Sequence, residues 1–331
     1  MRKAYKDYKS IIWLRLDSIG DAVLSSSMLP HIKVKFPEAN MTVVCQQHVA
    51  VLYETCPFVN KIIEMPFDCR FADDNQYQNV INQIKFINPD LLLNSVYALH
   101  HLSDLDGLDF IPERFAFRNE RKDKYTNIIS HTEEWILELL KNSQFLVELG
   151  IQTTSLQPQV WLIPGDFVGA YSIPVDNFIG LFAGVRTKER FYDKYWEALK
   201  GLDSFVVALG SKNDYDLNQE QLDKSGCNGI NLCGKLTLRE SIAVIKLAKL
   251  VVGGETGLAH AACAVETPNV ILLGGGHYGR FMPYSSLTSI VDNKMDCFRC
   301  NWYCKGDKNF ICVKEISTSK IRDAINKCLN K

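Results

Sequence analysis

The segment SIIWLRLDSIGDAVLSSSMLPHIKVKFPEANMTVVC, residues 10–45, contains the repeating unit from which the fold can be predicted. An apolar run at 10–16 predicts a buried strand, helical spacing of apolar residues predicts a helix over 21–36, and a second apolar run at 41–45 predicts the next strand. Pro30 interrupts the helical pattern and predicts a kink or a boundary there. Short apolar strands that alternate with helices are typical of a parallel sheet in an α/β domain.

The same alternation continues along the chain and restarts after a linker. In the first half we expect strands at 61–65 and 90–96, an irregular loop at 97–125 and a helix at 131–149. Residues 151–176 carry three prolines and two glycines, which is typical of a linker. In the second half we expect strands at 178–184, 204–210, 229–234, 249–254 and 269–276, and helices at 193–203, 214–224, 237–248, from Thr256 onward and at 316–331.

This pattern predicts two doubly wound α/β domains of similar size, with a boundary near residue 160. The chain of 331 residues is long enough for both. Ligands of such domains bind at the carboxyl ends of the parallel strands. We therefore expect the functional site in a cleft that the two domains face.

Composition and charge exclude several classes of protein. Hydrophobic residues make up 47% of the chain and charged residues 23%, as in ordinary globular proteins. The net charge of -1 disfavours a nucleic-acid partner. No apolar run approaches the roughly 20 residues of a membrane span, and the basic start MRKAYKDYKS lacks the features of a secretion signal. We expect a cytoplasmic protein whose N-terminus can contact the inner face of the membrane peripherally.

The first motif is the turn that follows the first predicted strand. Gly20 permits a tight turn, and Asp21 comes directly after it at the start of the predicted helix. A carboxylate here can cap the helix, or it can face the cleft and take a proton from an acceptor hydroxyl. The two roles are compatible, and Asp17 is a rival for either.

The second motif, GGETGLAH at 253–260, lies between a predicted strand and a predicted helix. Its small residues let a ligand approach the backbone, and amides at a helix N-terminus bind phosphate oxygens. Thr256 adds a hydroxyl. Glu255 can bond a sugar hydroxyl or cap the helix, and His260 can face the ligand or be satisfied in the core.

The third motif, RTKER at 186–190, follows the first predicted strand of the second domain. Its three cations can offset the charge of a diphosphate, although such a run can also be a solvated surface. The placement at the same sheet edge as Glu255 favours a role in binding.

The glycine-rich segment GGGHYG at 274–279 matches the spacing of a dinucleotide-binding loop. No helix is expected after it, because RFMPYSS follows and Pro283 interrupts the chain. The dinucleotide fingerprint needs that helix N-terminus for the pyrophosphate. The sequence therefore does not predict a nicotinamide cofactor.

Eleven cysteines in a cytoplasmic chain argue against a disulfide framework. Four of them fall within sixteen residues, in the segment CFRCNWYCKGDKNFIC at 297–312. Compact thiolate spacing of this kind suits a structural zinc or iron ion. Reduced thiols, or disulfides under oxidation, are the alternatives. The candidate ligands are Cys297, Cys300, Cys304 and Cys312. The other seven, which fall in apparent core segments, are Cys45, Cys56, Cys69, Cys227, Cys233, Cys263 and Cys328.

Three segments, in this order along the chain, resemble glycosyltransferase family 9, the heptosyltransferases of bacterial lipopolysaccharide synthesis. They are RLDSIGDAVLSSSMLPHIKVKFPEANMTVVC, GVRTKERFYDKYWEAL and GGETGLAHAACAVETPNVILLG. The resemblance implies a GT-B fold, with two Rossmann-like domains that face a central cleft. It places the acceptor on residues 1–160 and the nucleotide sugar on 161–315, and it implies that a helix at 316–331 packs back on the first domain.

The resemblance also implies the chemistry and the residues that carry it. The family inverts the anomeric centre by direct displacement and needs no metal or other cofactor for catalysis. Asp21 falls on the proposed catalytic base, with Gly20 and Asp17 on the acceptor side. The donor is expected to be ADP-heptose or another ADP-sugar, and the acceptor a bacterial glycan or glycolipid such as lipopolysaccharide core. Donor positions fall on Gly184, Val185, Arg186, Lys188, Arg190, Asp214 or Asp216, Leu236, Glu255, Thr256, Gly257, Leu258 and His260.

Within this list the resemblance assigns separate roles. Residues 256–260 fall on the diphosphate segment and Glu255 on the acidic position that contacts the sugar. Leu236 falls beside the adenine, and Asp214 or Asp216 near the ribose hydroxyls.

The sequence departs from the family pattern in three places. Phe191 and Tyr192 replace the usual Trp-Pro pair, so either Lys188 or Arg190 takes the role of the basic residue. Asp17 replaces a common small residue, and the cysteine spacing differs from an iron-binding motif of one family branch. Two alternatives stay open: another transferase or an epimerase that uses a different sugar nucleotide on the same fold, and a non-catalytic sugar-binding protein.

Overall fold

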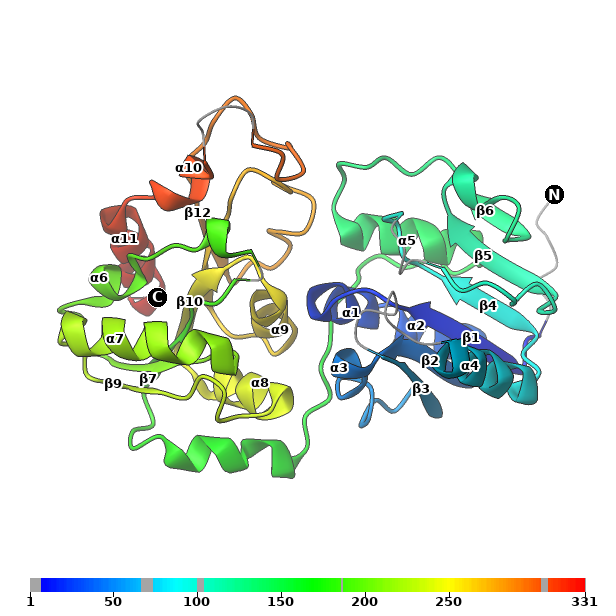
Figure 1. The fold of residues 1–331 in the computed structure, drawn as a ribbon, viewed down its shortest axis with the longest axis horizontal. Helices are drawn as coiled ribbons and strands as arrows, with labels where there is room; N and C mark the ends of the chain where they lie inside the picture. The colour runs from blue at the N-terminus through cyan, green and yellow to red at the C-terminus, as the bar shows by residue number, and fades with distance from the viewer. Residues whose placement is uncertain (1–6, 67–73, 100–103, 186, 305–308, 331) are drawn as a thin grey trace. The chain divides into compact units, whose positions relative to one another are not determined.

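The chain forms two compact units, Met1–Trp161 and Leu162–Lys331, in a computed structural model. The structure describes residues 7–66, 74–99, 104–185, 187–304 and 309–330. Each unit contains one parallel six-stranded sheet with helices packed on it (Figure 1). The division lies one residue beyond the expected boundary at 160, and the predicted pair of doubly wound α/β domains is confirmed.

The first unit has its central strand at β1, and the strand order changes direction there. The sheet order is β3-β2-β1-β4-β5-β6, so β2 and β4 pair with opposite sides of β1. The strands are β1 (Ser10–Arg15), β2 (Asn40–Gln46), β3 (Lys61–Met65), β4 (Leu91–Asn94), β5 (Glu113–Phe117) and β6 (Asn127–Ile129). The helices are α1 (Ile19–Ser26), α2 (Leu29–Lys35), α3 (Gln47–Ala50), α4 (Asp74–Ile87), the 3-10 turn η2 (Asn119–Arg121) and α5 (Glu138–Glu148).

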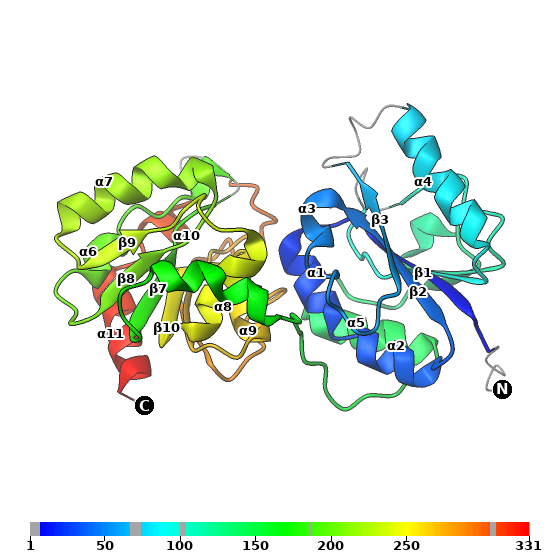
Figure 2. The ribbon, with the colours of Figure 1, turned by 90° about the horizontal axis from the view of Figure 1, so that it is seen from below.

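Helices cover both faces of this sheet (Figure 2). Alternate residues of β1 point to opposite faces, and its even-numbered apolar residues pack against Val80, Ile81 and Ile84 of α4. Helices α1 and α5 contact each other on the other face. The helix predicted at 21–36 is in fact two helices, because Pro30 lies in the first turn of α2, where its missing N–H costs nothing.

The second unit repeats this arrangement around β7. Its sheet order is β12-β11-β10-β7-β8-β9, so the order changes direction between β7 and β10. The strands are β7 (Phe178–Phe182), β8 (Phe205–Ala208), β9 (Gly229–Asn231), β10 (Leu250–Gly254), β11 (Asn269–Leu272) and β12 (Thr288–Val291). The helices are η3 (Pro164–Ser172), η4 (Lys188–Arg190), α6 (Tyr195–Leu199), η5 (Lys212–Asp214), α7 (Tyr215–Ser225), α8 (Leu238–Leu247), α9 (Gly257–Ala264), α10 (Ile311–Lys314) and α11 (Thr318–Leu329).

The C-terminal helix α11 packs on α6 and on the sheet of the second unit. Ile321 and Ile325 are fully buried in the core beside the second sheet. Arg322 donates to the carbonyl oxygens of Ala198 at 3.2 Å and Lys200 at 2.7 Å, at the end of α6. The apolar face of α11 is therefore buried against its own unit, where the ribbon shows the helix beside the second sheet (Figures 1 and 2).

A buried ion pair fixes the start of the second unit. Arg239 of α8 donates through Nε to Asp166 Oδ1 at 2.8 Å and through Nη2 to Asp166 Oδ2 at 2.6 Å. Burial alone would raise the pKa of Asp166, but the Arg239 hydrogen bonds hold that pKa below its ordinary value. The two-pronged contact attaches η3 to α8.

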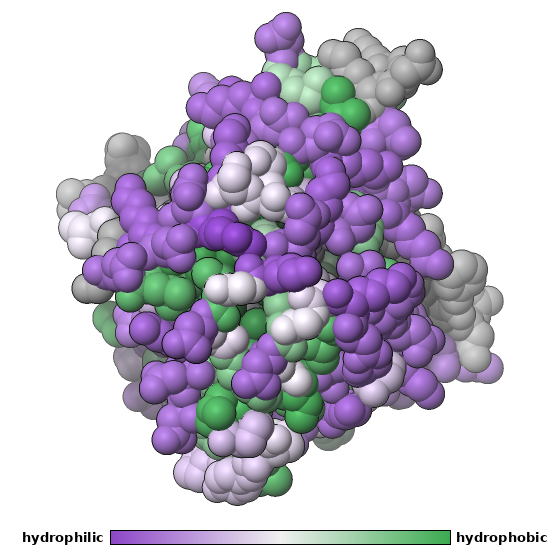
Figure 3. Space-filling view, turned by 90° about the vertical axis from the view of Figure 1, so that its left-hand side faces the viewer, coloured by the Kyte–Doolittle hydropathy of each residue, from purple (hydrophilic) through white to green (hydrophobic). Residues whose placement is uncertain are grey.

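The face in Figure 3 is covered mainly by hydrophilic residues, with apolar side chains in smaller groups between them. No helix in the described parts of the chain has both the length and the apolar character needed to cross a bilayer.

Candidate active site

Asp21 lies in the first turn of α1, directly after the central strand of the first unit. Ser18, which precedes the helix, donates its hydroxyl to Asp21 Oδ2 at 2.6 Å and its backbone N–H to the same oxygen at 3.4 Å. The pair forms a capping box in which Ser18 is the N-cap and Asp21 is the third helical residue. Asp21 is half-buried, and buried Gly20 precedes it in the same turn. The carboxylate is thus held at the point where the strand order changes direction, where such folds bind ligands.

Asp17 is more deeply buried and is already paired. Its carboxylate contacts Arg15 Nη2, and Arg15 also donates to Ser95 Oγ at 2.8 Å and to the backbone carbonyl of Asp21 at 3.2 Å. Burial raises the pKa of Asp17 to about 7, against the opposing effect of Arg15 and with a further increase from Asp21. Arg15 and Asp17 therefore support the turn, and Asp21 is the more accessible carboxylate.

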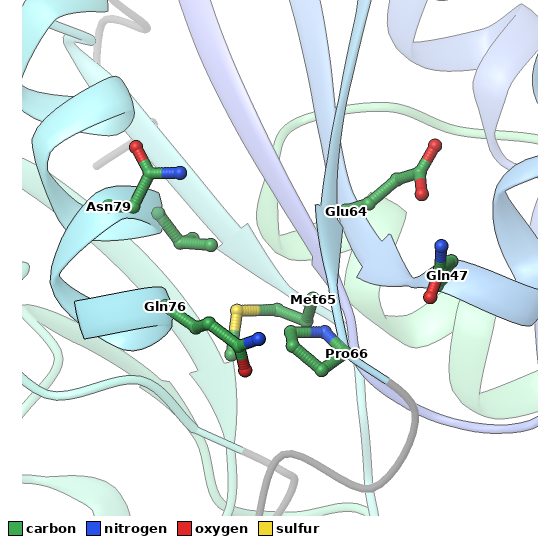
Figure 4. A pocket seen from close by; sticks show the side chains of 7 residues that line it. Gln47, Glu64, Met65, Pro66, Gln76 and Asn79 are labelled. Atoms are coloured by element: carbon green, nitrogen blue, oxygen red, sulfur yellow. The ribbon is translucent and has the colours of Figure 1, made fainter. Parts of the chain in front are cut away.

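A hollow of about 290 Å³ lies at the carboxyl ends of β2 and β3. Glu64 and Gln47 approach it from β3 and α3, while Gln76 and Asn79 approach from α4 (Figure 4). Met65, Pro66 and Val80 complete the lining. Amide and carboxyl groups over a small apolar floor match the hydrogen-bonding needs of a sugar. The hollow lies on the same sheet edge as Asp21, because β1, β2 and β3 are parallel neighbours.

In the second unit, the segment Glu255–His260 lies at the corresponding change in strand order. Phe182 of β7 pairs with Gly253 of β10, so the strands end side by side. Thr256 is the extended N-cap residue, and α9 begins at Gly257. The first amides of a helix have no partner within it, and they carry its positive dipole end. The backbone at Thr256, Gly257 and Leu258 is therefore suited to a phosphate group.

His260 is part of the core rather than an exposed ligand group. It is 3% exposed, and its ring stacks on that of Tyr284 with centroids 5.8 Å apart. Its Nδ1 lies 3.1 Å from the Tyr284 hydroxyl, and its Nε2 lies 3.9 Å from Glu255 Oε1. The structure thus supports the interpretation that His260 is satisfied internally, with Glu255 beside it.

Asp214 lies close to the end of β7. Ser211 donates to Asp214 Oδ2 from its hydroxyl at 2.7 Å and from its backbone N–H at 2.8 Å. A Cβ atom at Gly184 would lie 2.6 Å from the same carboxylate oxygen. Gly184 is therefore needed for this close approach. Of the two ribose candidates, Asp214 is beside Gly184 and half-buried Val185, whereas Asp216 is exposed on α7.

The remaining donor candidates occupy different surroundings. Leu236 is half-buried and packs against η3. A Cβ atom on Gly169 of η3 would lie 2.6 Å from the Cδ2 atom of Leu236. Lys188 is exposed. Arg190 is half-buried, donates to Thr187 Oγ1 at 2.5 Å and holds its guanidinium 4.5 Å from the ring centroid of Trp302. Arg186 lies outside the described residues.

The four clustered cysteines are not arranged as a ligand set. In the described ranges, which include all four, no three His, Cys, Asp or Glu side chains are placed to hold a metal ion. Cys304 is exposed and Cys312 is buried, with the Gly275 N–H 3.4 Å from its sulfur. Burial raises the pKa of Cys312, and the thiols of Cys304, Cys300 and Cys297 raise it further. The described cysteines are all free thiols.

Sequence patterns missed Trp302 and Tyr284, which contact the predicted donor residues. One signal for Trp302 was present in the run Gly274–Gly276. Successive glycines without a following helix indicate that something packs closely on the backbone. Here it is the Trp302 ring, which would lie 2.1 Å from a Cβ at Gly276.

Comparison with known structures shows the fold. A family 9 glycosyltransferase from Veillonella parvula superimposes with a TM-score of 0.82, over 98% of both chains at 17% identity. The ADP-heptose lipopolysaccharide heptosyltransferase II of Escherichia coli superimposes with a TM-score of 0.76, over 97% of this chain and 98% of that one at 20% identity. The predicted GT-B fold is thus confirmed. An iron-containing dodecameric glycosyltransferase from enterotoxigenic Escherichia coli shares the fold more distantly, with a TM-score of 0.59.

Sequence comparison finds similarity to one family over part of the chain. A model of glycosyltransferase family 9 (heptosyltransferase) matches residues 187–308. Lipopolysaccharide heptosyltransferase 2 of Salmonella typhimurium is 24% identical over 287 residues, which cover 77% of this chain and 80% of that protein. The chain is a glycosyltransferase that resembles the heptosyltransferases of glycosyltransferase family 9.

Proposed function

We propose that this enzyme transfers a heptose from ADP-heptose, with inversion of the anomeric centre, to a hydroxyl of a bacterial surface glycan such as lipopolysaccharide core. The observation that carries this proposal is the turn from β10 into α9. There Glu255, the amides of Thr256–Leu258 and the carboxyl end of β7 meet where the strand order changes direction. The two relatives with known names, a lipopolysaccharide heptosyltransferase 2 and an ADP-heptose heptosyltransferase II, support the choice of donor.

The second unit is proposed to bind the donor. The amides at the start of α9 and a cation from Lys188 or Arg190 would contact the diphosphate. Asp214 would bond the ribose hydroxyls, and Leu236 would pack on the adenine. Glu255 would accept a hydrogen bond from a hydroxyl of the transferred sugar. Gly184 and Val185 would let the diphosphate approach the backbone at the end of β7.

Asp21 is proposed as the general base. An Asp21 carboxylate oxygen takes the proton of the acceptor hydroxyl as that oxygen bonds to the anomeric carbon. The bond from the anomeric carbon to the diphosphate breaks at the same time, and the nucleoside diphosphate leaves with the bonding electrons. Helix amides and the cation then stabilise the growing negative charge. Attack opposite to the leaving group inverts the anomeric centre.

The first unit is proposed to bind the acceptor. The hollow lined by Gln47, Glu64, Gln76 and Asn79 offers groups that bond sugar hydroxyls, on the same sheet edge as Asp21. Gly20 and Asp17 would border the reacting hydroxyl. A cytoplasmic enzyme with peripheral contact at the inner membrane would meet such a glycolipid acceptor.

A panel of sugar nucleotides tests the donor. A ligand that binds only the folded protein must raise its melting temperature. ADP-heptose and ADP are expected to do so more than UDP- or GDP-sugars at the same concentration. Equal shifts for ADP, UDP and GDP would remove the adenine role of Leu236. A preference for another nucleotide would favour a different transferase or an epimerase on this fold. Donor binding without turnover over many acceptors would favour a non-catalytic protein.

We also propose one structural zinc or iron ion on Cys297, Cys300, Cys304 and Cys312. The compact spacing of these four cysteines along the chain motivates this proposal, and because they are not placed as a ligand set in the structure, the loop would have to rearrange to bind the ion. Elemental analysis of protein purified without chelators or a metal-affinity tag should find about one equivalent, lost on Cys300→Ser. Metal-free protein with four titratable thiols here would leave them as plain reduced cysteines.

A further inference from the structure

Trp302, in the cysteine-rich loop, lies directly on the glycine run that follows β11. If Gly274 carried a Cβ atom, that atom would lie 2.5 Å from the Trp302 ring, and a Cβ atom on Gly276 would lie 2.1 Å from it. The Asn301 N–H donates to the Gly276 carbonyl oxygen at 3.0 Å, so the backbone is attached as well. Packing that leaves no room for a Cβ atom fixes the plane and the depth of the indole.

A row of rings connects this indole to the proposed diphosphate segment. The indole N–H donates to His277 Nδ1 at 3.3 Å. The His277 ring packs edge-on against Phe281 with centroids 5.2 Å apart, and Phe281 packs against His260 at 6.4 Å. His260 ends the segment that begins at Glu255. The cysteine-rich loop and the start of α9 are therefore linked through one continuous set of contacts.

The Trp302 ring also holds the basic loop that follows β7. The Arg190 guanidinium lies 4.5 Å from the ring centroid, within the range of a cation–π contact, and Thr187 accepts a hydrogen bond from it. Lys188, two residues earlier, is exposed. A guanidinium held against a flat ring loses little further freedom when it meets an anion, whereas an exposed ammonium must be ordered at that moment.

We propose that Trp302 is a positioning residue of the donor site, which holds Arg190 in place to meet the diphosphate of the sugar nucleotide. This inference rests on the proposed function, because it assigns the cation of the donor site to Arg190 instead of Lys188. It also gives a role to two sequence features outside the catalytic motifs. The glycines at 274–276 make room for the indole, and the cysteine-rich loop carries it.

A double-mutant cycle on Trp302 and Arg190 tests this role. The ligands are inorganic pyrophosphate, ADP, UDP, GDP and adenosine, titrated calorimetrically into the full chain. Trp302→Leu and Arg190→Met are each expected to weaken pyrophosphate and the preferred nucleoside diphosphate by roughly tenfold. Adenosine, which has no phosphate, should bind equally to all variants. The double variant should bind diphosphate no more weakly than Arg190→Met alone, because Trp302 acts through Arg190.

Two further variants separate positioning from general packing. Trp302→Phe keeps a flat ring and should restore most of the diphosphate affinity. Tyr303→Leu changes the neighbouring side chain, which is 78% exposed, and should leave binding unchanged. If Trp302→Leu does not fold, the double-mutant cycle is made with Trp302→Phe instead. The loss of diphosphate affinity is then expected to be smaller than tenfold and to disappear when Arg190 is already replaced.

Three results would overturn the inference. The first is a Trp302→Leu variant that unfolds cooperatively and still binds pyrophosphate as tightly as the parent protein. Losses that simply add in the double variant would show that the ring packs without positioning Arg190. Equal losses for adenosine and for diphosphate would show a general disturbance of the unit. A parent protein that binds none of the diphosphates would instead reject the proposed donor site itself.

Discussion

Replacing Asp21 by Asn separates the two roles of this carboxylate. Asp21 Oδ2 accepts hydrogen bonds from the Ser18 hydroxyl at 2.6 Å and the Ser18 N–H at 3.4 Å. An amide oxygen can accept the same bonds without charge, so the expected loss of stability is at most about 1 kcal/mol. An amide cannot take the acceptor proton. A positioned base contributes about 100- to 10,000-fold, so the barrier should rise by about 3–5 kcal/mol.

Ser18→Ala is the matched control for this experiment. It removes the capping partner and keeps the carboxylate, so it should cost about as much stability as Asp21→Asn but reduce turnover only severalfold. Turnover is measured at saturating donor and acceptor, and stability by urea denaturation. The Asp21 variant should also keep its donor affinity, because the proposed donor groups are in the second unit. Near-normal turnover in Asp21→Asn would refute the reasoning and would leave Asp21 as a capping residue.

Three other perturbations follow from charges in the structure. Arg239→Leu should destabilise the second unit by about 3–5 kcal/mol, because it leaves the Asp166 carboxylate buried without its ionic partner. Adding Asp166→Leu to the same chain should recover much of the lost melting temperature. No recovery would contradict the ion-pair argument. The folded pKa of Asp17, about 7, exceeds its unfolded value of 3.8, so the folded state holds a proton that the unfolded chain releases. The free energy of unfolding of the parent, relative to that of Asp17→Asn, should therefore fall as the pH rises from about 4 to about 7 and then level off. Urea denaturation at several pH values measures it, and a difference between the two proteins that does not change with pH would contradict this prediction. Lys188→Ala should change ADP affinity by less than about threefold, since its exposed ammonium is not pre-ordered; a tenfold loss by calorimetry would return the cationic role to Lys188.

The central strands of both sheets could be predicted from the sequence because each is a short run of buried apolar residues. β1 and β10 were located to within a residue or two. The strands β5 and β12 were not predicted. β5 has the sequence ERFAF, in which charged residues interrupt the apolar pattern, and three of the four β12 residues are only half-buried. Strands with one polar side lose the continuous apolar signal on which the prediction depends.

The position of α11 could not be predicted, because an amphipathic pattern shows that a helix has an apolar face but not which unit buries it. The same limit applies to the candidate site. Asp21 and Glu255 can be singled out as candidates because each lies between a strand and a helix, which is a local pattern. The contact between Arg190 and Trp302 joins loops more than 100 residues apart, and no local spacing encodes it.

The most direct test of the central claim is a glycosyl-transfer assay with the purified full chain. ADP-heptose is supplied with a lipopolysaccharide-core acceptor that lacks the terminal heptose, and the product is analysed by NMR for the anomeric configuration of the new bond. We predict ADP release that depends on the acceptor, together with a product of inverted configuration. Acceptor-independent ADP release, a retained configuration, or no transfer from ADP-, UDP- or GDP-sugars would contradict an inverting glycosyltransferase with Asp21 as its base.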